Sequence, residues 1–196
     1  MIVLNTLRLL IRQIAPEDLN DSIEHRTDPD VCRFISDPMT MQEVKKFVDE
    51  HSKSWSGMIN EHLALAVVLK SENKLIGELK VQHANLTEKI TEIGFRFNKK
   101  YHKKGYAIEA TEALMKHLFS EFKLNRITAI CMDQNTDSFR LMEKLGMQRS
   151  SKKLPSAQIG SVVMVQIEYF ITKKMWYAGT VARALSYYSD SQKNNA

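Results

Sequence analysis

The stretch "KKYHKKGYAIEATEAL", Lys99–Leu114, decides the fold because it joins a basic turn directly to a helix. Four lysines and a histidine precede Gly105, and apolar side chains then recur at helical spacing, beginning with Ala107 and Ala110. We expect a helix that starts after the glycine and runs to about Phe122. Its N-terminus would carry unpaired backbone N–H groups and the positive end of the helix dipole, and glycine would let a ligand approach closely. The stretch therefore predicts an anion site, with phosphate as the usual guest.

Taken alone, the same residues also fit a solvated basic loop that ends in a turn glycine. The stretch contains neither the GxxxxGK[ST] pattern of a Walker phosphate loop nor the GxGxxG pattern of a dinucleotide-binding turn. A phosphate held here would have to rest on a shorter loop, so the flanking segments must decide between the two interpretations.

The segment just before this stretch, "ITEIGFRFN", predicts a strand by its alternation. One face would carry Thr91, Ile93, Phe95 and Phe97, and the other would carry Ile90, Glu92, Gly94 and Arg96. Further strands are predicted in "TLRLLIRQI", "RITAICMD" and the long final "VVMVQIEYFITKK", with a hairpin in "LALAVVLKSENKLIGELKVQ". This order predicts an α/β (α+β mixed) fold with one mixed sheet.

Helices are predicted between these strands by their start and stop signals. One opens at Pro16, a second has Thr40 and Glu43 as a capping box, and a third is closed by Gly146. The second helix would present Val44, Phe47, Val48, His51 and Trp55 on one face.

Composition limits the class of protein. The chain has 196 residues, 43% of them hydrophobic and 26% charged, which predicts a single domain over 1–178 followed by a polar C-terminal tail over 179–196. The formal net charge of +5 favours an anionic partner, whether nucleic acid, acidic protein or polyphosphate. No apolar run reaches the length of about 18 residues that would indicate a membrane span.

The two cysteines, Cys32 and Cys131, lie far apart and form no CxxC motif. This argues against a disulfide framework and against a zinc site, so no metal is expected. It also favours a reducing compartment, and we expect a cytoplasmic protein.

Four stretches together resemble the GNAT N-acetyltransferases. "HKKGYAIEA" is similar to their pyrophosphate loop, [QR]-x-x-G-x-[GA], with Gly105 and Ala107 matching and His102 replacing the usual Gln or Arg. "KKGYAIEA" looks like the "GKGYATEA" of the ribosomal-protein N-terminal (alanine/serine) acetyltransferase branch. "TLRLLIR", "KLIGELKV" with "TEIGFRFNKKYHKKGYA", and "NTDSFRLMEKLGMQR" resemble that branch in order and spacing. The resemblance covers roughly Leu4 to Trp176.

The resemblance implies a GNAT fold, with a mostly antiparallel sheet of about seven strands splayed between strands four and five and flanked by about four helices. It also implies acetyl-CoA as the donor, with the pantetheine arm paired to the fourth strand at a bulge near Phe95–Phe97 and the pyrophosphate held by backbone N–H groups. The implied cofactor-binding residues are Phe95, Arg96, Phe97, His102, Lys103, Lys104, Gly105, Tyr106, Ala107, Asn135 and Ser138. Lys103 and Lys104 would contribute long-range attraction more than specific contacts.

The resemblance further implies that Asn135 contacts the cofactor arm and that Ser138 protonates the departing thiolate. The plain structural interpretation makes Asn135 a helix N-cap and Ser138 an ordinary first-turn residue. Attack by the amine needs a proton acceptor, and Glu92 is the first candidate, directly or through a water. A salt bridge to Arg96 is the simpler role for Glu92, and Glu78 on the preceding strand is the second candidate base.

Other polar residues are better explained structurally. Glu109 and Glu112 stabilise a helix N-terminus, and the lone histidines His51, His83 and His117 are more often structural than catalytic. In its last strand the branch carries an aspartate near the position of Val165, whereas this chain offers only Gln166 and Glu168. Acceptor identity is therefore the least transferable part of the resemblance.

The leading functional hypothesis is an acetyl-CoA-dependent N-acetyltransferase that acts on a protein or peptide N-terminal α-amine by direct attack in a ternary complex. A polyamine, an aminoglycoside or an amino acid is the alternative acceptor, and a nucleic-acid-binding module or a CoA-binding protein without catalysis is the alternative class. No RRM, KH or zinc-finger signature supports nucleic-acid binding. The aromatic pair Tyr187–Tyr188 in the tail is compatible with docking on a second copy, as in a homodimer.

Overall fold

The computed structural model describes residues 2–53, 62–85 and 88–179. Its strands are β1 (Val3–Asn5), β2 (Leu9–Gln13), β3 (His62–Leu69), β4 (Lys74–Asn85), β5 (Ile90–Phe97), β6 (Arg126–Met132), β7 (Gln148–Arg149), β8 (Ala157–Ile159), β9 (Val162–Met164) and β10 (Gln166–Thr172). Its helices are η1 (Pro16–Asp18), α1 (Leu19–Arg26), α2 (Pro29–Cys32), α3 (Met41–His51), η2 (Lys99–Tyr101), α4 (Tyr106–Ser120) and α5 (Thr136–Lys144), and residues 173–179 are also helical. No helix in these ranges is long and apolar enough to cross a membrane.

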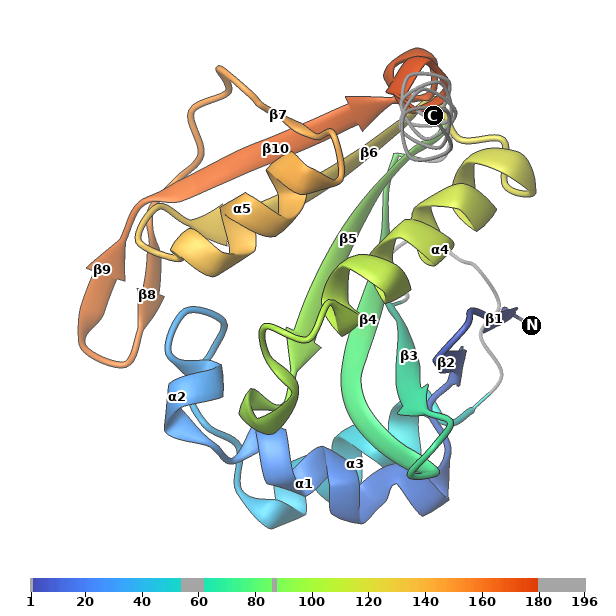
Figure 1. Ribbon diagram of the computed structural model, residues 1–196. Coiled ribbons are helices and arrows are strands. Elements are labelled where there is room, and N and C mark those ends of the chain that lie inside the picture. Colours follow the sequence, from blue (N-terminus) through green and yellow to red (C-terminus); the bar gives the residue numbers. More distant parts are fainter. Residues whose placement is uncertain (1, 54–61, 86–87, 180–196) are drawn as a thin grey trace, which may run out of the picture.

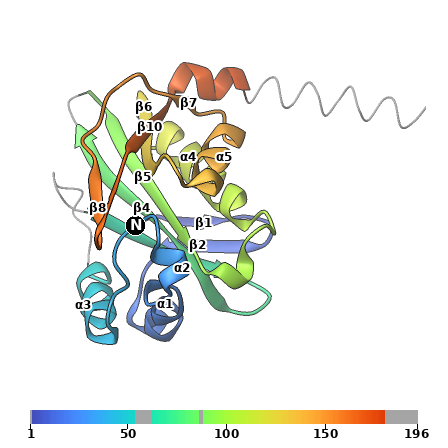
Figure 2. The same ribbon diagram turned by 90° about the vertical axis from the view of Figure 1, so that its left-hand side faces the viewer.

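One mixed, mostly antiparallel sheet of eight strands forms the centre of the molecule, in the order β1-β2-β3-β4-β5-β6-β10-β7. Helices α4 and α5 lie on one side of it, and α1, α3 and β8 lie on the other (Figure 2). The main core packs the apolar stripe of α4, including Leu114, Met115 and Phe119, against the sheet. A smaller core packs Val44 and Val48 of α3 against the opposite face. The predicted fold class is confirmed.

The sheet splays between β5 and β6, the only parallel pair among the described strands. These strands pair from Ile90–Glu92 with 126–128, and the remainder of β5 has no partner on that side within residues 2–53, 62–85 and 88–179. Figure 1 shows the two strands diverging, with the start of α4 below the gap between the ribbons. Because β1 was not predicted as a separate strand, β5 and β6 are the fourth and fifth strands of the predicted order. The splay expected between them begins immediately after Glu92.

Local sequence signals account for several elements. Thr40 and Glu43 form the predicted capping box, with the Glu43 carboxylate accepting from the Thr40 backbone N–H at 2.7 Å. Gly146 takes a φ of 82° just past the end of α5, in the left-handed region that glycine reaches without strain. The predicted α4 is confirmed, although it ends at Ser120 and not at about Phe122.

The first and last predicted strands differ from the structure in extent. The strand predicted in "TLRLLIRQI" is β2, and β1 precedes it to form a hairpin in which Leu4 pairs with Ile11. The last predicted strand breaks at Val165, so that β9 pairs with β8 in a separate ribbon and only β10 enters the main sheet. The carbonyl of Val165 accepts from the Asp133 N–H at 3.0 Å, while the Val165 side chain is 53% exposed.

The bulge expected near Phe95–Phe97 is absent from the pairing of β4 with β5, whose register runs unbroken from Phe97 opposite Gly77 to Thr91. A bulge lies instead on the other edge of β4, opposite Val67 and Val68. The Phe97 ring packs so closely on Gly77 that no side chain fits there, which explains the glycine. Trp55 and all but the first residue of the tail predicted over 179–196 lie outside the described residues.

Candidate active site

The turn before α4 has the geometry of an anion site. Gly105 is the N-cap of the helix with φ 81° and ψ 2°, and no side chain caps it in the described structure. The Gly105 carbonyl accepts the first helical bond, from the N–H of Glu109 at 3.1 Å. The N–H groups of the first turn, including those of Tyr106 and Ala107, therefore have no partner within the helix and face outward at its positive end. This arrangement suits a phosphate.

Arg8, which the sequence alone did not single out, lies beside this turn. Its guanidinium donates to the Lys104 carbonyl at 3.0 Å and stacks over the Tyr106 ring at 4.4 Å from the ring centroid. A Cβ placed on Gly105 would lie 3.4 Å from Arg8 Nη2. The only signal for this arginine was its place in the "TLRLLIR" stretch, because its contacts lie about a hundred positions away in the chain.

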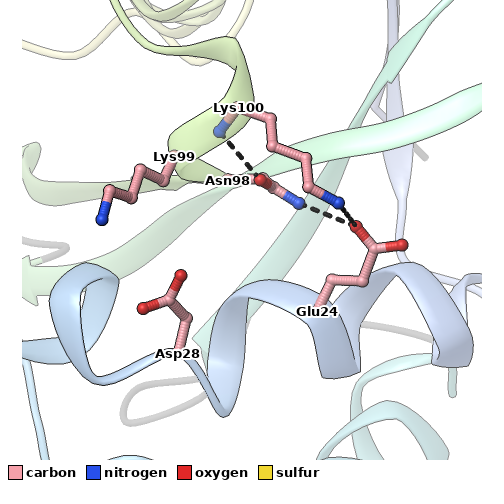
Figure 3. Close-up of a pocket in the computed structure, with 5 residues that line it drawn as sticks. All are labelled: Glu24, Asp28, Asn98, Lys99 and Lys100. Carbon is pink, nitrogen blue, oxygen red and sulfur yellow. Dashed lines mark hydrogen bonds and ion pairs between the residues drawn. The ribbon is translucent and has the colours of Figure 1, made fainter.

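Two of the four lysines in the basic turn are already neutralised. Lys99 forms an ion pair with Asp30, and Lys100 Nζ lies 3.6 Å from the Glu24 carboxylate. These lysines line a cleft of about 360 Å³ against α1 and α2, together with Asp28 and Asn98 (Figure 3). Part of their charge is thus offset by acidic side chains of α1 and α2, which leaves Lys103 and Lys104 as the lysines of the turn without a described carboxylate partner.

The cofactor-binding candidates Lys103 and Lys104 remain near the turn. Neither pairs with a carboxylate within the described ranges, and Lys104 Nζ lies 5.3 Å from the centre of the Tyr101 ring. The His102 ring contacts the Phe97 carbonyl through Nε2 at 2.9 Å, which ties the turn to the end of β5. The structure thus brings 102–107 next to the end of β5, and the binding of acetyl-CoA by these residues stays a prediction.

Glu92, the first candidate base, lies at the vertex of the splay. It is half-buried and pairs with Gln82 of β4 and with Thr128 of β6 at the last point where the strands meet. Burial raises the pKa of Glu92, the nearby charge of Lys80 opposes this, and the charge of Glu168 adds to it. A carboxylate with a raised pKa is better matched to proton abstraction near neutral pH. No hydrogen bond or ion pair joins Glu92 to Arg96 among the described contacts.

Glu78, the second candidate, is fully engaged with α1. Its Oε1 accepts from Ser22, His25 and Arg26 at 3.0–3.2 Å, and its Oε2 pairs with the Arg26 guanidinium. Burial alone would raise the pKa of Glu78, but the His25 hydrogen bond and the Arg26 charge outweigh it and hold that pKa far below its usual range. Glu78 is only 4% exposed, so its geometry suits a structural ion pair and not a proton acceptor.

A second carboxylate, that of Glu168, faces the same side of the sheet as Glu92. In the sequence Glu168 stood out only as a departure from the branch. Glu168 of β10 is 6% exposed and lies 3.3 Å from Arg126 Nη2 and 3.6 Å from Lys152 Nζ. Its charge is therefore balanced by two cations, whereas Glu92 has no ion pair among the described contacts and the positive charges that act on it are those of Lys80 and Lys152.

Asn135 and Ser138 lie at the start of α5, beyond the end of β6. The Asn135 Oδ1 accepts from the Ser138 N–H at 3.1 Å, so Asn135 is an N-cap. Ser138 is 9% exposed. Burial raises the pKa of the Cys131 thiol to about 11, and a hydrogen bond with Ser138 partly offsets this. The hydroxyl therefore lies against β6, and the roles of both residues in the reaction stay predictions.

Two of the three candidate histidines, His51 and His117, have structural contacts. The His51 ring stacks on Phe47 at 4.0 Å, with Nδ1 2.8 Å from the Phe47 carbonyl. His117 packs edge-on against Phe122. The side chain of His83 lies outside the described part of the chain. No group of three or more potential metal ligands occurs among the described residues.

A sheet splayed beside an uncapped helix N-terminus, with a half-buried carboxylate at the vertex, places an anion site near a candidate proton acceptor, as an acyltransferase with a nucleotide-linked donor requires. The acetyltransferase (GNAT) domain model matches residues 8–148. The chain belongs to this family, and it is an acetyl-CoA-dependent N-acetyltransferase of the GNAT type.

Relatives agree over nearly the whole chain. The uncharacterized N-acetyltransferase YnaD of Bacillus subtilis is 32% identical over 174 residues, which are 88% of this chain and 98% of YnaD. The crystal structure of a GNAT-family acetyltransferase from Bacillus anthracis is 33% identical with a TM-score of 0.78, covering 88% of this chain and 99% of that one. Spermidine N-acetyltransferase from Vibrio cholerae, solved with CoA and spermine, has a TM-score of 0.74 at 15% identity, covers 88% of this chain and 99% of that one, and shows the fold alone.

Proposed function

We propose that the acceptor of this acetyltransferase is the N-terminal α-amine of a protein or peptide, as in the ribosomal-protein branch that its motifs resemble. The observation that carries this proposal is the mixed charge around Glu92. Lys80 and Lys152 are the cations whose charges act on Glu92, and the only other carboxylate that acts on it, Glu168, is balanced by Arg126 and Lys152. These surroundings suit an acceptor with one amine and disfavour a polyamine or an aminoglycoside, whose several positive charges need an acidic groove.

Each substrate group has its own partner residues in the proposed reaction. Acetyl-CoA supplies an activated acetyl group, with the backbone of Phe95–Phe97 beside its arm and the N–H groups of 102–107 at its pyrophosphate. Glu92 accepts the proton that the attacking amine must lose, through its carboxylate at the vertex of the splay. Ser138 Oγ gives a proton to the departing sulfur. The amine attacks directly, with both substrates bound.

An acceptor screen tests the proposal. CoA thiol release would be followed with peptides that carry ribosomal-protein N-termini, with spermidine and spermine, with aminoglycosides and with free amino acids. We expect turnover of peptides at micromolar to millimolar KM and none of polyamines. Turnover of polyamines in preference to every peptide would overturn the peptide assignment.

The two other classes are tested by binding. Calorimetric titration with acetyl-CoA and, separately, with RNA separates the enzyme from a basic nucleic-acid-binding module, and we expect binding of acetyl-CoA only. A CoA-binding protein without catalysis would bind acetyl-CoA but release no thiol with any acceptor. The pairing of Lys99 and Lys100 with acidic side chains reduces the basic surface on which the nucleic-acid alternative depends.

A further inference from the structure

Arg96 lies on the same face of the sheet as Glu92, four residues further along β5. Four strand residues span about 13 Å between Cα atoms. This part of β5 has already left β6, so Arg96 lies beside the splay and not within the paired sheet. The face is the one covered by α1 and α3 (Figure 2).

The Arg96 guanidinium is incompletely satisfied. Its Nη2 donates to Ser36 Oγ at 3.1 Å, in the segment between α2 and α3. Its Nη1 is buried and has no hydrogen-bond partner in the part of the chain that the structure describes. A buried donor without a partner is costly, because it loses its bonds to water and gains none in return.

The nearest carboxylate cannot fill this gap. Glu78 lies directly opposite Arg96 in the ladder between β4 and β5, but both of its oxygens are taken by α1, chiefly by Arg26. The neighbouring Lys80, which lies opposite Gly94 on the same face, adds another positive charge. Burial lowers the pKa of Arg96, with the charge of Arg26 acting in the same direction and that of Glu78 opposing it. The unpartnered donor on the Arg96 guanidinium therefore favours an anion at this end of the face.

We propose that Arg96 binds a carboxylate carried by the acceptor, so that the enzyme prefers peptides with an acidic residue close to the reacting amine. The inference rests on the proposed peptide acceptor and names its chemistry. Arginine presents its donors as a planar fork that matches a carboxylate. In binding, a carboxylate oxygen takes the place of the Ser36 hydroxyl at Nη2 and satisfies Nη1.

The spacing sets the position of the acidic residue. Four residues of one strand separate Glu92 from Arg96, so a carboxylate bound at Arg96 would lie roughly 10 Å from an amine at Glu92. An extended peptide advances about 3.4 Å per residue. An aspartate at the second or third position of the acceptor therefore fits, whereas one at the sixth or seventh does not.

Peptide pairs test this directly on the wild-type enzyme. Hexapeptide amides that differ only by Asp or Asn at position two or three would be compared by kcat/KM and by calorimetric binding in the presence of CoA. We expect a preference for Asp of roughly ten- to a hundredfold at one of these positions, carried by KM, because charge-assisted hydrogen bonds have this strength. Equal values for Asp and Asn peptides would overturn the inference while leaving the peptide acceptor intact.

Variants locate the preference. Arg96→Gln should abolish it, and Arg96→Lys should retain part of it. Arg33→Gln is the matched control, because Arg33 is an exposed arginine in the neighbouring segment whose described contact is with the Phe34 ring. A preference that survives in Arg96→Gln, or disappears equally in Arg33→Gln, rejects the role of Arg96. If Arg96→Gln does not fold, as judged by thermal unfolding, the wild-type peptide pairs and Arg96→Lys still decide.

The carboxylate could also come from a free amino acid, and a separate arm distinguishes this source. Glutamate and aspartate would be compared with glutamine and asparagine as acceptors. Turnover of the acidic amino acids that depends on Arg96, together with no turnover or binding of any peptide, would retain the carboxylate site and reject the peptide acceptor. Absence of binding by every carboxylate-bearing amine would reject both.

Discussion

The Glu109 carboxylate in the first turn of α4 holds Arg8 by both its backbone and its side chain. Oε1 accepts from the Arg8 N–H at 3.0 Å, and Oε2 accepts from Arg8 Nε at 2.6 Å. Thr6 Oγ1 adds a third donor at 2.6 Å from Oε1. The turn between β1 and β2 is thereby docked on the N-terminus of the helix that forms the predicted pyrophosphate site.

We expect Glu109→Gln to destabilise the fold by about 1–2 kcal/mol. A neutral amide has only one oxygen to accept from the three donors, and its hydrogen bonds are weaker than the charge-assisted bonds of a carboxylate. Urea denaturation would measure the free energy of unfolding. Glu50→Gln is the control, since Glu50 makes only an exposed pair with Lys46 at 3.9 Å and should lose no more than about 0.5 kcal/mol. Equal losses in the two variants would show that the Glu109 contacts contribute nothing beyond a surface pair.

Gly105→Ala should weaken acetyl-CoA binding by about tenfold or more. The φ of 81° disfavours any side chain, and the new Cβ would project toward Arg8 Nη2 at the mouth of the turn. Calorimetric titration with CoA would measure the change in Kd. Gly146→Ala is the matched control, because Gly146 has nearly the same φ of 82° but lies at the end of α5. Both should lose comparable stability, so a loss of CoA affinity confined to Gly105→Ala identifies the phosphate site.

Glu92→Gln should lower kcat by roughly a hundredfold or more, as expected for loss of a general base. Because burial raises the pKa of Glu92, the wild-type rate should fall as the pH drops through a value above the usual glutamate range. This acidic limb should be missing from the residual activity of Glu92→Gln and unchanged in Glu50→Gln. An acidic limb that persists in Glu92→Gln assigns the proton acceptor to another group.

Sequence patterns predicted elements whose signals are local. The capping box at Thr40 and the alternation over Ile90–Phe97 each depend on residues within one helical turn or one strand, and both were confirmed. The break in the last strand was missed because an apolar run such as "VVMVQIEYF" does not show where the chain leaves one ribbon for another. That decision depends on partners distant in sequence, such as the bond from Asp133 to Val165.

The site was predicted unevenly for the same reason. The glycine turn follows from backbone chemistry within a few residues, whereas the engagement of Lys99 and Lys100 by α1 and α2 depends on residues about 70 positions earlier. Alternation placed Glu78 and Glu92 on polar faces of adjacent strands, but it could not reveal that Arg26 and His25 occupy one of them. Charge patterns identify ionisable residues and leave their partners undetermined.

The ion pair between Glu78 and Arg26 predicts how the protein unfolds in acid. The folded-state pKa of Glu78 lies far below its unfolded value, so its stabilising contribution is present above the unfolded pKa of about 4.3 and is lost as the pH falls below that value. Each pH unit below about 4 should then cost up to about 1.4 kcal/mol for this one proton.

Glu78→Gln removes that dependence but leaves Arg26 buried without its carboxylate, which should cost about 3–5 kcal/mol at pH 7. The double variant Glu78→Gln with Arg26→Met should recover part of this loss, because the Arg26 charge is removed together with its carboxylate. Its unfolding free energy should also vary less with pH between 3 and 5 than that of the wild type. Urea denaturation across pH 3–7 measures both effects, with Glu50→Gln as the exposed control. A double variant as acid-sensitive as the wild type would place the responsible carboxylate elsewhere.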